Sequence, residues 1–352
     1  MSVTQKRRSR AVITLGAVFA SLFLATGPSR AVDRLNIATA TNATLYGPVW
    51  VALAEKLFEK RGLDVNLVST TALSTGPALL VSGNADLVVT TAFLGLRIAT
   101  EGKPLRFLMT TSDMGTRINA FVGRPNLKSI KDLADKGDAC RVIVATVGTG
   151  SWAIWLGLAK KYDLKCAVSN SGSGPAILAS ALSGQFDAGV VNPQEAYTAR
   201  DAGKASILLD PLTISDEEAS EIYPHRHPLS VVVGMGPNLE AKRDVVVRFL
   251  AALREAGDRI AASSPEQLSA LSRVLPQVFG SMTPSALALQ WQVQAKLSPH
   301  GPEAGVISRE EWKNLLDAAP LLWGFANLRP DEPTLQYDKV VDMSYFEAAR
   351  GK

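Results

Sequence analysis

The sequence predicts an α/β protein of two related lobes, each a mostly parallel sheet flanked by helices. Apolar strand-like runs alternate with helix-like segments, which is typical of parallel sheets. The segment 74–91, STGPALLVSGNADLVVTT, has a counterpart at 172–192, GSGPAILASALSGQFDAGVVN. The chain has 352 residues, of which 47% are hydrophobic, and this is enough for two cores. We therefore expect two similar α/β units.

Each copy of this repeat predicts a helix, a tight turn and a buried strand. Pro77 and Pro175 stand where the first turn of a helix accepts proline. Gly83 and Gly184 stand where a helix ends, because glycine adopts the left-handed conformation without a β-carbon clash. The Val-rich runs that follow are apolar on both faces, as in a strand that is covered on both sides.

The other elements alternate in the same way along the chain. In the first half we expect strands at 35–41, 63–70, 87–91 and 105–111, and helices at 48–62, 76–83 and 93–102. After 118–125 the pattern restarts, with strands at 142–148, 167–172, 188–192 and 205–210 and helices at 129–137, 151–163, 174–184 and 193–203. A strand at 230–235 and helices at 239–263, 265–275, 284–297 and 308–326 follow.

The first 31 residues have the features of a cleavable signal peptide. Four basic residues precede the apolar run AVITLGAVFASLFLATG, and Ser29-Arg30-Ala31 is a small-x-small cleavage site. This run is short for a membrane span, so we expect cleavage after Ala31, and an uncleaved anchor is the alternative. Residues 1–31 carry five Lys and Arg and no acid, so the net charge of +4 becomes −1 without them. We expect a periplasmic protein, and the charge does not favour binding to nucleic acid.

Cys140 and Cys166 are the only cysteines of the chain. Each stands just before a strand-like run, so parallel neighbouring strands would bring both to the same end of a sheet. In an oxidising compartment we expect a disulfide, which would stabilise the fold by roughly 3 kcal/mol on the chain-entropy model. Two buried free thiols are the alternative, and partner residues for a zinc site or a cysteine nucleophile are lacking.

Four loops predict a ligand site, because open parallel sheets bind ligands outside the carboxyl ends of their strands. The loops 39–47, 90–95, 147–152 and 192–196 are rich in Thr, Ser, Gly and Asn and lead into helices. Free N–H groups at helix N-termini favour anions, although ordinary helix capping is the alternative for any single loop. The predicted ligand-binding residues are Thr41, Asn42, Tyr46, Thr90, Thr91, Thr149, Gly150, Ser151, Trp152, Asn192, Glu195 and Arg117.

The charges of these residues predict the kind of ligand. The four loops contain no Lys or Arg, and Arg117 is the nearest cation, whereas Glu195 would repel an anion. A dianion needs a nearby cation to offset its desolvation, so we expect an organic monoanion or a zwitterion. Tyr46 and Trp152 are expected to line its apolar part, with packing in the core as the alternative.

Several stretches resemble the periplasmic solute-binding proteins of ABC importers in the nitrate, sulfonate and taurine group. They are VWVALAEKLFEKRGLDVNLV (49–68), ALLVSGNADLVVTT (78–91), SIKDLADKG (129–137), LSGQFDAGVV (182–191) and YDKVVDMSYFEAA (337–349). The resemblance implies a two-lobe periplasmic binding protein fold of type II, with two crossovers. The first lobe would comprise 32–124 and 227–352 and the second 125–226, with hinges near Arg124–Ser129 and Pro224–Leu229.

The same resemblance implies capture by closure of the lobes and delivery to an ABC transporter permease. No cofactor is expected, and the protein would be a monomer. The family often has an acidic residue before the proline that follows the third strand of the second lobe, whereas this chain has Asn192-Pro193. Ligands of the family range from inorganic anions and sulfonates to pyrimidines, so the resemblance does not name the ligand.

Two alternatives remain open beside a transport protein. A pyrimidine synthase of thiamine biosynthesis shares the fold, but it needs an active-site histidine and a cysteine-rich iron motif. The chain has only His225, His227 and His300, and the first two form an i, i+2 pair without a visible third metal ligand. Asp86 and Asp187 would stand away from the cleft, which favours turn and capping roles over catalysis. We expect a binding protein without a metal, and a periplasmic ligand sensor would share every feature seen here.

Overall fold

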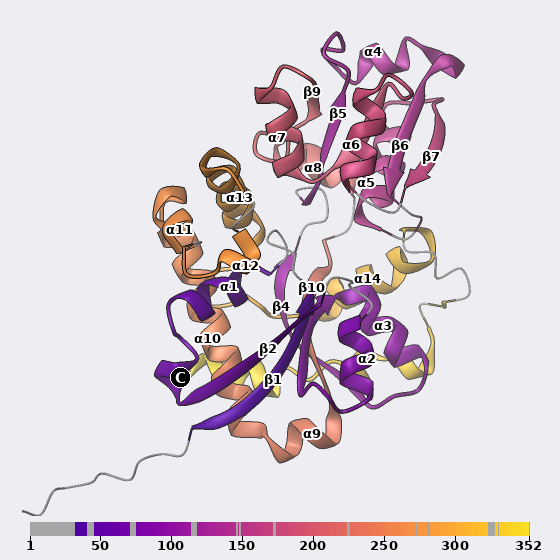
Figure 1. Ribbon diagram of the computed structural model, residues 1–352. Helices are drawn as coiled ribbons and strands as arrows, with labels where there is room; N and C mark the ends of the chain where they lie inside the picture. Colours follow the sequence, from indigo (N-terminus) through magenta and orange to yellow (C-terminus); the bar gives the residue numbers. More distant parts are fainter. Residues whose placement is uncertain are drawn as a thin grey trace, which may run out of the picture. The chain divides into compact units, whose positions relative to one another are not determined.

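The computed structural model contains two five-stranded β-sheets flanked by helices (Figure 1). It describes residues 32–40, 46–70, 75–113, 118–145, 147, 149–171, 174–223, 226–271, 273–279, 282–322, 328–329 and 331–351. The predicted signal peptide, 1–31, lies outside these ranges. Within them, no helix has both the length and the apolar character that crossing a membrane requires.

The first sheet has the strand order β2-β1-β3-β10-β4. β1 pairs in parallel with β2 and β3, whereas β10 runs antiparallel between β3 and β4. Val88 and Val89 lie in different apolar clusters, so both faces of the sheet are covered. The bounds are β1 Asp33–Ala40, β2 Leu63–Thr70, β3 Leu87–Thr91, β4 Leu105–Asp113 and β10 Pro228–Met235.

The second sheet repeats this plan with the order β7-β6-β8-β5-β9. β6 pairs in parallel with β7 and β8, and β5 runs antiparallel between β8 and β9. The bounds are β5 Ala120–Gly123, β6 Arg141–Ala145, β7 Ala167–Ser171, β8 Ala188–Val191 and β9 Ser206–Leu209. The two sheets define a two-lobe α/β fold, as the sequence predicts.

The antiparallel strand of each sheet follows directly after a crossover between the lobes. The chain enters the second sheet between β4 and β5 and returns to the first between β9 and β10. β5 pairs with β8 and β9, so the first crossover precedes Ala120 rather than following Arg124, where we expected it. The difference arises because a short apolar strand carries no sign of the strand with which it pairs.

Helices follow most strands, as expected. The first lobe contains α1 Gly47–Ala54, α2 Thr75–Val81, α3 Ala92–Thr100, α9 Gly236–Ala241, α10 Arg243–Ala262, α11 Pro265–Leu271, α12 Pro276–Phe279, α13 Pro284–Leu297, α14 Arg309–Leu322, α15 Tyr337–Val340 and α16 Ser344–Arg350. The second contains α4 Lys131–Ala134, α5 Gly150–Lys161, α6 Gly174–Leu182, α7 Pro193–Asp201 and α8 Asp216–Ile222. Short 3-10 turns lie at Glu59–Arg61, Gly137–Ala139 and Pro333–Leu335.

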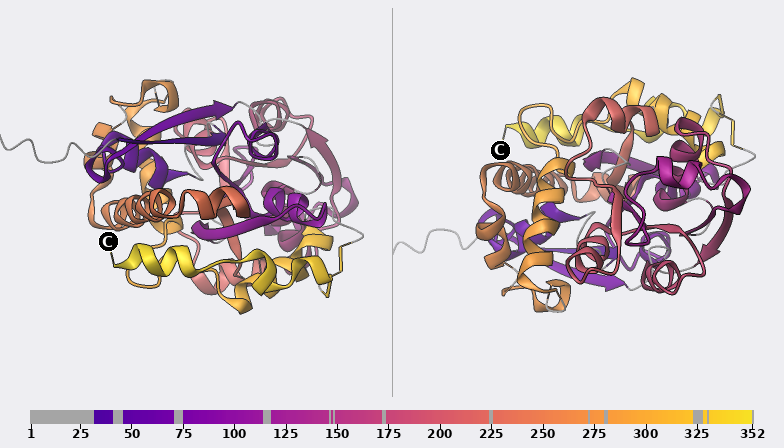
Figure 2. Two further views of the ribbon diagram at one scale, coloured as in Figure 1. Left: turned by 90° about the horizontal axis from the view of Figure 1, so that it is seen from below. Right: turned by 90° about the horizontal axis from the view of Figure 1, so that it is seen from above.

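The C-terminal helices cover the first sheet. The 20-residue α10 packs against α1 and α16, and Figure 2 shows α10 and α16 side by side.

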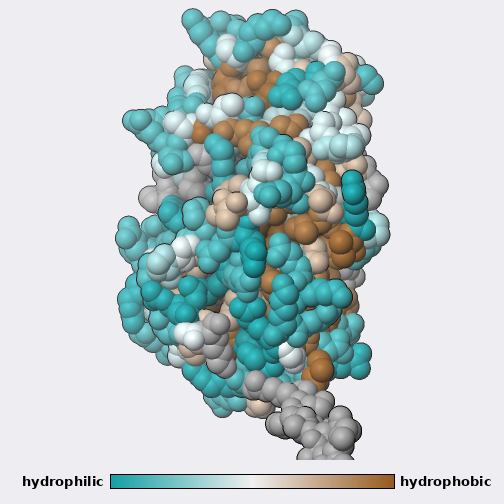
Figure 3. All heavy atoms as spheres, turned by 90° about the vertical axis from the view of Figure 1, so that its left-hand side faces the viewer, coloured by the Kyte–Doolittle hydropathy of each residue, from teal (hydrophilic) through white to brown (hydrophobic). Residues whose placement is uncertain are grey.

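Figure 3 shows the side of the molecule on which α11 and α13 lie in Figure 1, where hydrophilic side chains predominate with apolar groups between them. Large apolar side chains with substantial exposure, among those described, are Val32, Val81, Val147 and Val274.

The repeat forms equivalent units in the two lobes. α2 and β3 flank Gly83, which has φ +76°, and α6 and β8 flank Gly184, which has φ +83°. Both glycines therefore take the left-handed conformation that ends a helix. Asp86 and Asp187 follow these turns, and each accepts a backbone hydrogen bond from a neighbouring strand, from Asn36 N and Arg141 N respectively, at 2.9 Å. The carboxylates thus have a structural role, but they join adjacent strands instead of forming the turns or caps that the sequence favours.

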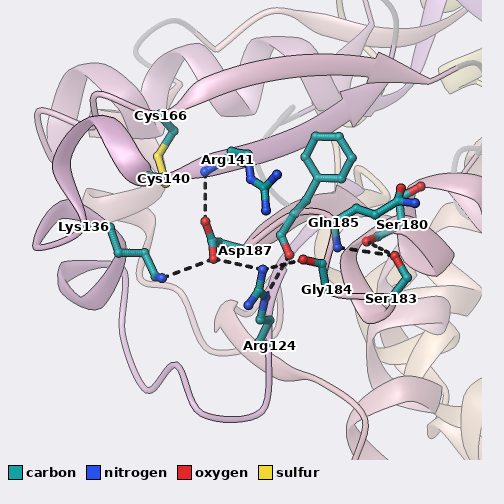
Figure 4. Close-up of polar contacts among 11 residues, drawn as sticks. Arg124, Lys136, Cys140, Arg141, Cys166, Ser180, Ser183, Gly184, Gln185 and Asp187 are labelled. Carbon is teal, nitrogen blue, oxygen red and sulfur yellow. Dashed lines mark hydrogen bonds and ion pairs between the residues drawn. A yellow bond between two sulfur atoms is a disulfide. The ribbon is translucent and has the colours of Figure 1, made fainter.

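Each of these aspartates also pairs with basic side chains. Lys242 Nζ lies 2.7 Å from the Asp86 carboxylate. In the second lobe, Arg124 and Lys136 lie 3.4 Å and 3.3 Å from the Asp187 carboxylate (Figure 4). Arg124 also donates to the carbonyl oxygens of Gly184 and Phe186, which ties β5 to the turn of the repeat.

Cys140 and Cys166 form the disulfide that the sequence predicts (Figure 4). Their Cα atoms are 4.4 Å apart because β6 and β7 are parallel neighbours, with Arg141 opposite Ala167. The bridge therefore closes the same end of the second sheet at which Asp187 holds Arg141.

Candidate functional site

Four helices begin at the carboxyl ends of parallel strands, two in each lobe. In the first lobe, α1 follows β1 and α3 follows β3; in the second, α5 follows β6 and α7 follows β8. The predicted loops therefore lead into helix N-termini at equivalent positions of the two sheets. Backbone N–H groups at such positions point toward a ligand outside the sheet edge.

A row of hydroxyl groups crosses this edge of the first sheet. Thr91, Ser230 and Ser112 lie opposite one another on β3, β10 and β4 and therefore share one face of the sheet. Thr111 Oγ1 donates to Ser230 Oγ at 2.9 Å. The sequence predicts Thr91 but not the two serines, because they become its neighbours only when β10 returns from the second lobe.

Three buried hydroxyls at this edge have no hydrogen-bond partner in the described part of the chain: Tyr46, Thr90 and Ser112. Tyr46 and Ser112 have no exposed surface, and Thr90 is 2% exposed. Burial raises the pKa of the Tyr46 phenol, so it is a donor at neutral pH. Because buried polar groups are normally paired, these hydroxyls indicate that a further polar species belongs at this edge.

The predicted residues around α5 hold the second lobe together. Ser151 Oγ accepts from Ala145 N at 3.1 Å and donates to Val190 O at 3.3 Å, which joins β6 to β8. Thr149 Oγ1 accepts from Trp152 N at 3.3 Å and caps the helix. The Trp152 side chain is half-buried and packs against the core. Thr149 and Trp152 thus make the helix-capping and core-packing contacts that are the alternatives to ligand binding.

Gly150 has a steric reason to be glycine. A β-carbon there would lie 2.5 Å from Ile118 Cδ1, so the first turn of α5 fits closely against the first crossover. The neighbouring Asn119 is 8% exposed and donates to Val191 O at 3.2 Å, at the end of β8. Asn119 is not among the predicted residues, although it lies beside the N-termini of both α5 and α7.

The N-terminus of α7 is capped by the side chain of Glu195, a residue of the same helix. Glu195 Oε2 accepts from Asn192 N at 3.2 Å, as in a capping box. Burial raises the pKa of the Glu195 carboxyl, although its hydrogen bonds with Asn192 act in the opposite direction. Glu195 therefore places a half-buried acid where an anionic ligand would otherwise approach the helix.

The two lobes differ in how their helix N-termini are capped. The N-cap residues of α1 and α3, Tyr46 and Thr91, form no capping hydrogen bond with their own side chains. In the second lobe, Thr149 caps α5 and Glu195 reaches back over the start of α7. The first lobe therefore offers the stronger attraction for a negative group.

Three predicted ligand-binding residues, Thr41, Asn42 and Arg117, lie outside the described residues. His225 also lies outside them, whereas His227 is 1% exposed, with its Nε2 2.9 Å from the Tyr223 hydroxyl. In the part of the chain that the structure describes, no group of three His, Cys, Asp or Glu side chains is placed to hold a metal.

A pocket of about 790 Å³ is lined by residues of both lobes. Second-lobe residues Asp216 and Ser220 and first-lobe residues Lys296 and Glu311 contribute to its walls. None of the predicted ligand-binding residues that the structure describes is among those that line it. Beside it, Arg226 lies 3.4 Å from Glu311, and Asn314 donates to Arg226 O at 2.9 Å. These contacts connect the second crossover to α14.

Comparisons with known proteins agree with the two-lobe fold. Residues 43–267 match the model of a family described as NMT1/THI5 like. The ligand-binding component of an ABC-type import system from Staphylococcus aureus, with zinc bound, has a TM-score of 0.68 at 15% identity, over 90% of this chain and 99% of that chain. The periplasmic aliphatic sulphonate binding protein SsuA from Escherichia coli has a TM-score of 0.63 at 17% identity, over 84% and 88%.

The periplasmic nitrate-binding protein NrtA from Synechocystis PCC 6803 has a TM-score of 0.64 at 13% identity, over 91% of this chain and 89% of that chain. No curated relative matches the chain. At these identities the solved structures share the fold with this chain, while their ligands differ from one another.

Proposed function

The chain belongs to the NMT1/THI5-like family, and from this premise we propose that it is the solute-binding component of an ABC importer. It captures a small organic monoanion or zwitterion of the sulfonate or taurine type between its two lobes. It then presents this ligand to a permease, after export to the periplasm. The likeness to the sulphonate-binding protein SsuA supports this ligand class.

The observation that carries the proposal is the set of buried hydroxyls at the carboxyl edge of the first sheet. Tyr46, Thr90 and Ser112 have no partner in the described ranges. Tyr46 and Thr90 stand just before α1 and α3, and Ser112 lies across β10 from Thr91. Hydroxyl and backbone donors together suit the oxygens of a sulfonate, which carries a single negative charge.

The negative charge of Glu195 in the second lobe predicts how the ligand is oriented between the lobes. Glu195 stands at the start of α7, so an anionic group is favoured at the first lobe and an amino group at the second. A compact dianion such as sulfate would need a cation close by, because neutral donors alone rarely offset its desolvation. Arg117 remains the predicted candidate for that cation.

The cysteines and His227 favour a binding protein over the thiamine-type pyrimidine synthase, because none of them is placed for catalysis. Cys140 and Cys166 are joined in a disulfide, which removes them from iron chemistry. His227 is buried between Tyr223 and Phe93, with aromatic contacts on both sides. A periplasmic sensor would share these features, and capture of a permease from detergent-solubilised membranes by the tagged protein separates the two roles.

A ligand screen tests the proposed ligand class. We expect taurine or an alkanesulfonate to raise the thermal unfolding midpoint, because a ligand at a hundred times its Kd stabilises the native state by about 2.7 kcal/mol. Sulfate and phosphate should leave the midpoint unchanged. Stabilisation by a pyrimidine alone would favour the alternative of a thiamine-precursor binder.

Closure of the lobes is the expected response to a saturating ligand. The two crossovers are the only main-chain connections between the sheets within the described ranges, so bending there moves the lobes as bodies. Small-angle scattering should show a smaller radius of gyration with ligand than without it. The same radius at saturation would contradict hinge closure while leaving binding intact.

A further inference from the structure

α13 connects the two lobes, although its place in the chain belongs to the first. It packs against α10 and α11 of the first lobe and also against α7 of the second. In Figure 1 it lies between α1 and α7. When the crossovers bend and the lobes move apart, α13 must lose its contacts with one of them. The strength of these contacts therefore influences how far the lobes open.

α13 contacts the first lobe at Gly47, the first residue of α1, where the missing side chain leaves a notch. A β-carbon at Gly47 would lie 2.3 Å from Gln294 Cδ, 2.4 Å from its Cγ and 2.7 Å from its Nε2. The Gln294 side chain therefore lies directly over the first residue of α1. A β-carbon at position 47 would therefore require the Gln294 side chain to move.

Gln294 is held in this notch by a buried polar stripe on α13. Gln290, Gln294 and Ser298 recur at four-residue intervals and are 1%, 0% and 4% exposed. Gln294 Nε2 donates to Ser298 Oγ at 2.7 Å. This bond lies within α13 and its C-cap residue, so it holds the Gln294 side chain in the conformation that lies against Gly47.

The contact of α13 with the second lobe extends beyond α7. Lys296 Nζ donates to the carbonyl oxygen of Leu212, in the segment that follows β9. That segment is itself tied to α7, because Asp210 accepts from both Leu212 N and the Tyr197 hydroxyl. Lys296 and the packing of α13 on α7 thus engage one connected part of the second lobe.

We propose that α13 is a strut that sets how far the lobes open, with Gln294 in the Gly47 notch as its anchor on the first lobe and Lys296 as a contact with the second. Gln294 and Lys296 are positioning residues, because they act on the lobes rather than on a ligand. The proposal concerns the ligand-free protein, so it holds whether or not the ligand is a sulfonate.

Inter-lobe distances measured by electron paramagnetic resonance test the strut. Glu101 and Lys204 are exposed, one in each lobe, and cysteines introduced there carry the spin labels while Cys140 and Cys166 stay in their disulfide. In Gly47→Ala, Gln294→Ala and Lys296→Met we expect a longer and broader distance distribution than in the otherwise unchanged protein. Gly47→Ala should have the largest effect, because the new β-carbon would displace the Gln294 side chain from its buried position.

Matched controls separate the strut from general destabilisation. Gly236→Ala changes another Gly-Pro helix start in the first lobe, where the nearest atom to the new β-carbon is Pro104 O at 3.3 Å. Lys313→Met removes a lysine whose ion pair, within the part of the chain that the structure describes, is with Asp317 on its own helix. Both should keep the original distribution. If Gly47→Ala does not fold, Gln294→Ala and Lys296→Met decide the matter, and unchanged distances in the folded variants would overturn the proposal.

Discussion

Replacement of Asp187 by asparagine is expected to lower the free energy of unfolding by about 2–3 kcal/mol. The carboxylate is 4% exposed and lies 3.4 Å from Arg124 and 3.3 Å from Lys136. Asparagine can still accept from Arg141 N, but it leaves the two cations without their negative partner. The cations are about one-third exposed, so the loss should be at the lower end of values for a broken buried ion pair.

Urea unfolding followed by circular dichroism measures this loss, with Asp163→Asn as the control. The Asp163 side chain is 85% exposed and pairs with Lys165 on the surface, so its replacement should change stability by no more than about 0.5 kcal/mol. The same small change in Asp187→Asn would mean that the interaction of Asp187 with Arg124 and Lys136 contributes little to stability. The equivalent Asp86, with Lys242 as its partner, provides an independent repetition in the other lobe.

The repeat could be predicted from the sequence because each of its steps depends on local chemistry. Gly83 and Gly184 end their helices with positive φ, as their position after an apolar helical run indicates. The disulfide could be predicted because it requires only that β6 and β7 be parallel neighbours. The position of β5 could not, since its partners β8 and β9 lie more than sixty residues further along the chain.

The candidate site shows the same division between local and long-range information. Thr90 and Thr91 could be placed at the sheet edge because they end an apolar strand that precedes a helix. Ser230 and Ser112 gain their position beside Thr91 from the return of β10, which no spacing in the sequence reveals. Side-chain direction was also out of reach: Ser151 follows a strand as the other candidates do, but its hydroxyl joins β6 to β8.

Glu195→Gln is expected to change which ligands the protein prefers. Its carboxylate stands at the start of α7, and burial raises its pKa. Glutamine can keep the capping hydrogen bond from Asn192 N, so the substitution removes the charge and preserves the helix start. A zwitterion should lose about 1–3 kcal/mol of binding free energy with its charged partner, whereas a simple sulfonate should bind equally well or more tightly.

Isothermal titration of both proteins with taurine and ethanesulfonate measures this change in preference, with Glu217→Gln, an exposed site on α8, as the control. Acidification gives a second readout with a defined sign. Protonation removes the negative charge of Glu195, and the raised pKa places this change above the usual range for a glutamate. Taurine binding by the original protein should therefore weaken at mildly acidic pH, whereas binding by Glu195→Gln should not. Equal affinities in all four pairings of protein and ligand would mean that Glu195 does not face the bound ligand.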